Sequence, residues 1–136
     1  MIFKKVSITE KRGVEITYLD KENVFSVQSF DDYTPDFFNS IRSLGASLLV
    51  FCELPADYLP RVEVTGVTFS HSNEKEFFCL VARMLLDRRP GHYLNLVSPL
   101  VPVMPGMLQE MLEVVKDNAA LFLNGSRQQV DLFDQH

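Results

Sequence analysis

Alternating apolar and polar residues over the first 30 positions predict three β-strands. Apolar side chains share one parity in the runs 2–8 and 14–18, and a third apolar run follows at 24–27. The polar sequences Lys-Arg-Gly at 11–13 and Leu-Asp-Lys-Glu-Asn at 19–23 separate these runs. Because successive side chains of a strand point to opposite faces, the pattern indicates an antiparallel meander with one buried face.

A change to three- and four-residue spacing then predicts a helix. Thr34 suits the N-cap, Pro35 suits the first helical position, and Asp36 lies favourably in the first turn. The apolar stripe expected to face the sheet consists of Phe37, Phe38, Ile41, Leu44, Leu48 and Leu49. Gly45 lies inside this predicted helix, where we expect it to permit close packing against the sheet.

Three more strands are predicted in the second half of the chain. Apolar residues occupy even positions at 62–64 and odd positions at 67–69. The change of parity falls at Gly66, where we expect a β-bulge. The run 76–86 is apolar on both parities, which is typical of a central strand covered on both faces, and 93–97 follows as a sixth strand.

A second helix closes the predicted fold. The proline-rich segment 98–106 is expected to be an extended connection, and a helix starts near Met107 and ends at Asn124-Gly125. Its apolar face consists of Leu108, Met111, Leu112, Val115, Ala119 and Phe122. The order βββα-βββα predicts an α+β fold, a mainly antiparallel sheet of about six strands packed by two helices. Residues 1–125 would form a single globular domain and residues 126–136 a C-terminal tail.

Composition narrows the function classes. The chain has 136 residues, enough for one domain with a real core, and a net charge of −5. Non-specific nucleic-acid affinity comes largely from Lys and Arg, so we expect no direct nucleic-acid contact. No apolar run approaches the ~20 residues of a membrane span, and no signal peptide is visible. We therefore expect a cytoplasmic protein with no membrane partner.

The sequence offers little support for catalysis. Cys52 and Cys79 lie in apolar runs and are expected to be buried free thiols. His71 and His92 lie beside predicted turns, outside any metal-ligand pattern. We therefore expect no enzyme activity, no metal and no cofactor. An unrecognised active site would require a pocket with convergent polar groups around His71, His92 or Arg83.

The polar C-terminal tail contains an unexpected apolar pattern. Gln129, Val130, Asp131, Leu132 and Phe133 form a sequence that resembles the clamp-binding pentapeptide of bacterial replication and repair proteins. The usual form of that motif is Gln, an often aliphatic residue, Ser or Asp, Leu and then Phe, and every position matches. The resemblance implies that the tail docks on a bacterial sliding clamp, the ring-shaped processivity factor.

The chemistry of the five residues suits such docking. Leu132 and Phe133 would enter a hydrophobic cleft, while the Gln129 amide would form hydrogen bonds at its rim. Burial of two such side chains yields on the order of 1.5–3 kcal/mol each. Ordering the tail costs roughly 0.5–1.5 kcal/mol per immobilised side chain. The expected affinity is about micromolar to sub-millimolar, which suits transient docking on a shared partner.

A broader resemblance agrees with this interpretation. The segments KVSITE, GVEITY, RVEVTGVTFS and YLNLVSPLVP, followed by the terminal DLF, are similar to those of small uncharacterised phage and prophage proteins. Such proteins are found among phage recombination and replication genes. The resemblance implies an accessory protein of DNA metabolism and carries over no catalytic residue.

The residues of the tail also allow a different interpretation. Val130 and Phe133 are three positions apart and could form an apolar turn that packs back on the domain. Alternatively, Leu132 and Phe133 could insert into a groove of a second copy, for example by adding a strand to a sheet edge. The protein would then be a structural or self-associating module, a homo-oligomer rather than a clamp-binding protein.

Overall fold

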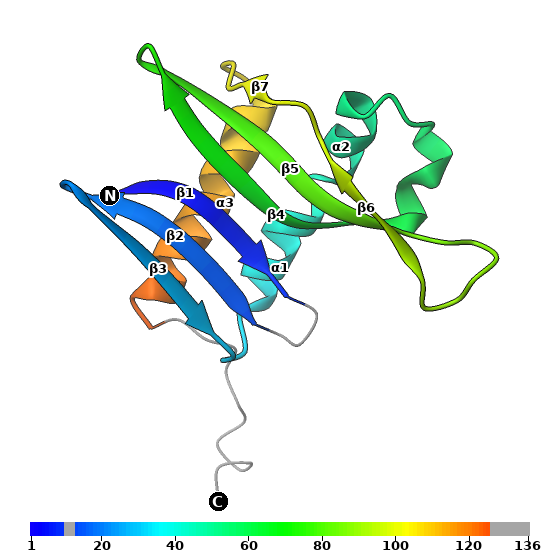
Figure 1. The fold of residues 1–136 in the computed structure, drawn as a ribbon, viewed down its shortest axis with the longest axis horizontal. Helices are drawn as coiled ribbons and strands as arrows, with labels where there is room; N and C mark the ends of the chain where they lie inside the picture. Colours follow the sequence, from blue (N-terminus) through cyan, green and yellow to red (C-terminus); the bar gives the residue numbers. More distant parts are fainter. Residues whose placement is uncertain (10–12, 126–136) are drawn as a thin grey trace, which may run out of the picture.

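The protein has a two-layer α+β fold, in which the helices lie on one face of an antiparallel sheet (Figure 1). The computed structural model describes residues 1–9 and 13–125. The strands are β1 (Ile2–Ile8), β2 (Val14–Asp20), β3 (Asn23–Ser29), β4 (Val62–Ser72), β5 (Lys75–Leu85), β6 (Tyr93–Val97) and the short β7 (Val101–Pro102). The helices are α1 (Pro35–Arg42), α2 (Gly45–Phe51), the 3-10 helix η1 (Ala56–Arg61) and α3 (Met107–Leu123). The predicted fold class is confirmed.

The strand order is symmetric about the middle of the sheet. The six long strands run β3-β2-β1-β4-β5-β6, and β7 pairs with β5 off this path. Each half is therefore a three-stranded meander followed by a helical segment. The halves join where residues 5–7 of β1 pair with residues 66–68 of β4. Toward the N-terminus of β1 the two strands diverge, and α3 passes behind the opening (Figure 1).

The predicted β-bulge at Gly66 is confirmed. The register between β4 and β5 shifts between Val64 and Gly66. The extra residue changes which side of the sheet the following side chains point to. Val64 and Val67 are therefore both buried in the core, although one occupies an even and the other an odd position. The same strand can thus bury apolar residues on both sides of the bulge.

The first predicted helix is interrupted in the structure. Thr34 caps α1 as expected, because its hydroxyl accepts a hydrogen bond from the Phe37 amide. The helix ends at Arg42, and α2 begins at Gly45. The Ser43 hydroxyl donates to the Ser40 carbonyl, and such bonds compete with helix propagation next to a glycine. Gly45 does not make the predicted close approach to the sheet, since a Cβ atom added to it would meet the side chain of Leu59 in η1 rather than a strand.

Two further expectations are corrected in the second half. Strand β5 lies inside the sheet, between β4 and β6, but only one of its faces is fully buried. Phe78 and Leu80 are fully buried, whereas Phe77, Cys79 and Val81 on the other face are half-buried. Within residues 1–9 and 13–125, the helices all pack on the first face, so the second face has no helical layer over it. The segment 98–106 is extended as predicted, but Val101–Pro102 also pairs with β5 as β7.

One apolar cluster fills the space between sheet and helices. The largest fully buried side chains are Phe37, Phe78, Phe122, Ile16, Ile41, Leu44, Leu48, Leu80, Leu112, Val6, Val64 and Val67. Phe37 of α1 and Phe122 of α3 meet edge to face, with their ring centroids 5.8 Å apart, and this contact joins the two helices. In the described part of the chain, no helix is long and apolar enough to span a membrane.

Candidate functional site

The C-terminal pentapeptide, residues 129–133, lies outside the described residues, but the structure defines the point where the tail begins. Helix α3 ends at Leu123, and Asn124 caps it with its amide bonded to the Ala120 and Leu121 carbonyls. Gly125 follows with φ +105°, a backbone conformation that favours glycine. The predicted helix end is confirmed, so the pentapeptide starts at Gln129, six positions beyond the last residue of α3.

A cavity of about 370 Å³ lies next to the start of the tail. It is lined by Met1, Tyr18, Asp20, Val27, Phe122, Leu123 and Asn124. Strands β2 and β3 therefore form one wall and the C-terminal turn of α3 the other. The lining combines apolar side chains with the Asp20 carboxylate and the Asn124 amide. Such a lining can accept an apolar segment with a few polar groups.

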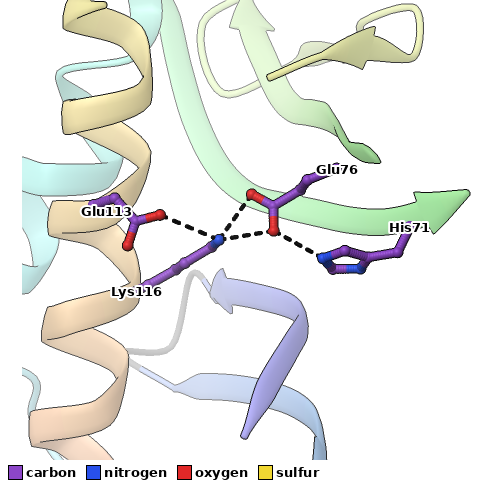
Figure 2. A network of polar contacts seen from close by, with 4 residues as sticks. All are labelled: His71, Glu76, Glu113 and Lys116. Carbon is purple, nitrogen blue, oxygen red and sulfur yellow. Dashed lines mark hydrogen bonds and ion pairs between the residues drawn. The ribbon is translucent and has the colours of Figure 1, made fainter. Parts of the chain in front are cut away.

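His71 belongs to a polar network that links three elements (Figure 2). Its Nε2 lies 2.9 Å from Oε2 of Glu76 on the neighbouring strand. The same carboxylate accepts two hydrogen bonds from Lys116 of α3, at 2.8 and 2.9 Å. Lys116 Nζ also lies 3.4 Å from Oε1 of Glu113 and 4.8 Å from the centroid of the Phe69 ring. The network fastens α3 to the end of the β4–β5 hairpin.

The network borders a second cavity, of about 310 Å³. Its lining comprises Met1, Ile2, Phe3, His71, Glu76, Glu113, Lys116, Asp117 and Ala120. It lies at the opening between β1 and β4. The structure thus brings polar groups together around His71, the arrangement that an unrecognised active site would require. The Lys116 amine lies between the carboxylates of Glu76 and Glu113. This arrangement is typical of a structural ion pair.

Arg83 lies in a separate charged cluster at the opposite end of β4. Its Nε donates to Oε2 of Glu63 at 2.6 Å, and Arg42 of α1 lies 3.3 Å from the same oxygen. Partial burial alone would raise the pKa of Glu63, but hydrogen bonds and positive charge from the two arginines outweigh it, so the pKa lies below its ordinary value. Arg83 also lies over the Tyr93 ring at 4.6 Å. This cluster connects α1, β4, β5 and β6.

The remaining candidates are scattered. His92 is exposed in the turn before β6, where its amide bonds to the Arg89 carbonyl. Cys52 and Cys79 are free, as expected, but half-buried rather than fully buried. Burial, and to a lesser degree Cys79, raises the pKa of the Cys52 thiol. Among residues 1–9 and 13–125, no group of three or more His, Cys, Asp or Glu side chains is arranged to hold a metal ion.

Comparison with known proteins finds no similarity for this chain: no family model, no curated protein and no solved structure matches it.

Proposed function

We propose that this chain is a non-enzymatic, phage-type accessory protein of DNA replication or recombination that docks on a bacterial sliding clamp. Gln129, Leu132 and Phe133 are the anchors, and Val130 and Asp131 support them. The agreement of all five positions with the clamp-binding pattern carries the proposal. Binding would either recruit a further protein to the clamp or block the clamp's other clients.

The end of α3 is compatible with this role. A clamp-binding peptide must extend its Leu and Phe side chains into a cleft of the partner, and a regular helix would place them differently. Because α3 ends at Leu123 and Gly125 has a positive φ, the helix stops before the motif begins. Residues 124–128 separate the end of α3 from the motif in the sequence.

The proposal is tested by competition for an immobilised clamp. A synthetic peptide of residues 126–136 should displace the full-length protein, with an inhibition constant in the range of about micromolar to sub-millimolar. A peptide of the same composition but shuffled order is the matched control and should not compete. If the two peptides competed equally, or neither did, the motif would not be a clamp-docking element.

The alternative function, a tail that packs on its own domain or on a neighbouring copy, is favoured by the cavity beside Phe122 and Leu123. That cavity has an apolar wall and lies at the point where the tail begins. Size-exclusion chromatography of the full chain and of a chain without residues 126–136 separates the two functions. Loss of an oligomer on truncation would favour tail-mediated association.

A further inference from the structure

The helical layer leaves part of the core face of the β2–β3 hairpin uncovered. Val14 and Ile16 of β2 are buried in the core, and Tyr18 continues the same face of the strand. Tyr18 pairs with Phe25 and Ile16 pairs with Val27, so both β3 side chains also point to the helical side of the sheet. Phe25 is nevertheless 43 % exposed, and Tyr18 and Val27 are only half-buried. The apolar face of the sheet therefore extends beyond the helices that cover it.

The cavity of about 370 Å³ lies in this uncovered corner, directly beside the end of α3. Tyr18 and Val27 contribute to its lining from the sheet, and Phe122 and Leu123 contribute from the last turn of the helix. Phe25 stacks on the Tyr18 ring, with the ring centroids 5.3 Å apart. Helix α3 passes behind the strands and ends on the β3 side of the sheet (Figure 1). The chain therefore leaves α3 at the rim of an apolar cavity.

Position and length select the C-terminal tail as the occupant of this cavity. Asn124 belongs to the lining, and residues 126–136 follow it after a single glycine. An extended chain spans roughly 3.3 Å per residue, so Leu132 and Phe133 can reach back across the cavity. A short tether gives an effective concentration of about millimolar. Even a weak contact of the tail therefore forms in preference to the same contact with a separate partner.

The chemistry of the tail matches the lining as well. Leu132 and Phe133 supply apolar side chains for the apolar walls of the cavity. The Asp20 carboxylate adds negative charge to the lining, and Arg127 carries positive charge close to the start of the tail. Opposite charges at this distance along the chain favour a tail that folds back over the hairpin.

We propose that the tail folds back into this cavity, with Leu132 and Phe133 against Tyr18 and Val27, and thereby masks the clamp-binding motif. The masking rests on the proposed clamp docking, whereas the contact itself can be tested without a clamp. The same two side chains cannot fill the cavity and the clamp cleft at once, so the clamp binds only molecules whose tail is free. The full chain should bind the clamp about 3- to 10-fold more weakly than a peptide of residues 126–136, as expected if the tail is free in roughly a tenth to a third of the molecules.

A tryptophan in the motif would report the contact directly. The chain contains no tryptophan, so Phe133→Trp introduces a single fluorescent reporter. Its emission should lie at shorter wavelength in the full chain than in a peptide of residues 126–136 with the same substitution. The emission should not change on dilution, because the contact lies within one molecule. Emission equal to that of the peptide would overturn the proposal, and a shift that is lost on dilution would overturn it in favour of association between two copies.

Val27→Glu and Val24→Glu form a matched pair on one strand. Val27 lines the cavity, whereas Val24 points to the other face of the sheet and is 68 % exposed. Combined with Phe133→Trp, Val27→Glu should move the emission to the value of the peptide. With the natural tail it should raise the affinity for the clamp by about 3- to 10-fold. Val24→Glu should do neither, and equal behaviour of the two variants would overturn the proposal.

Circular dichroism verifies that both variants fold. If Val27→Glu did not fold, Asp20→Arg at the exposed end of β2 would take its place, because it repels Arg127 and should shift both readouts in the same direction. No shift in either readout would then overturn the proposal.

The two readouts also separate this contact from the proposed function. If the emission showed a buried tail but the peptide did not bind the clamp, clamp docking would fail while the contact between tail and cavity stood. If the peptide bound the clamp but the emission of the full chain equalled that of the peptide, clamp docking would stand and the masking would be overturned.

Discussion

Gly66 of β4 lies so close to Ser7 of β1 that a Cβ atom on the glycine would be 2.7 Å from the serine Cβ. The Val6 carbonyl oxygen would be 3.0 Å away. This contact lies in the short stretch where the two halves of the sheet pair. Glycine is therefore required at the junction, at the position where β4 also carries its bulge.

Substitution of this glycine tests the junction. We expect Gly66→Ala to lower the free energy of unfolding by about 1–3 kcal/mol, since the added methyl group must displace backbone of β1. Urea unfolding followed by circular dichroism measures the change. Gly45→Ala is the control, because its new Cβ would meet only the flexible end of Leu59, at 3.2 Å. Equal stability of Gly66→Ala and the unmodified chain would contradict the observed packing.

The charged cluster around Glu63 predicts a dependence of stability on pH. The pKa of Glu63 is lower in the folded protein than its ordinary value of 4.5. The ionised carboxylate therefore makes its full contribution to the free energy of unfolding at pH values above the ordinary pKa. This contribution is lost as the pH falls through the lowered pKa of the folded protein. Glu63→Gln should reduce the free energy of unfolding by roughly 1–3 kcal/mol near pH 7.

The same variant provides its own control at low pH. Once Glu63 is protonated in both states, the variant and the unmodified chain should differ little in stability. Denaturant unfolding at a series of pH values from neutral downward measures the difference. A difference that stayed constant over the whole series would show that the carboxylate charge does not stabilise the fold.

The contact between Lys116 and Glu76 predicts a coupling between α3 and the β4–β5 hairpin. The Lys116 side chain is only 16 % exposed. The substitution Lys116→Met removes this charge and should lower the free energy of unfolding. The loss should exceed the ~1 kcal/mol of an exposed ion pair but stay below the ~3 kcal/mol of a fully buried one. Lys75→Met removes an exposed lysine and should have little effect. A double-mutant cycle with Glu76→Gln should give a clear interaction energy, and additive effects would count against the pairing.

Much of the fold was predictable because most elements follow a simple periodicity. The alternation of Val14 and Ile16 and the change of parity at Gly66 both depend on local geometry that sequence reports directly. The prediction that Ile2 shares the buried face of Val6 and Ile8 was wrong, because the register of β1 shifts between Phe3 and Lys5 and Phe3 is buried in its place. The interruption at Ser43 was missed because the apolar stripe continues through it, from Ile41 to Leu48. Both helices on either side of this turn bury their apolar residues in the same core. The helix-like spacing therefore continues across the turn and does not reveal it.

The charged contacts were less predictable, because they join residues distant in sequence. Glu76 and Lys116 are 40 positions apart, and Glu63 meets Arg83 only through strand pairing. The open face of β5 was also missed, since apolar residues on both parities suggest two covered faces whether or not a second layer exists. The clamp-binding motif is a linear pattern in the tail, readable from sequence without any knowledge of the fold.

The most direct test of the account is a calorimetric titration of the full-length protein into a bacterial sliding clamp. The unmodified chain should bind saturably, and Leu132→Ala/Phe133→Ala should not bind although its domain remains folded. Asp134→Ala, next to the motif, should bind much like the unmodified chain. Absence of binding up to about millimolar concentration, or equal binding by the double variant, would contradict the proposed function.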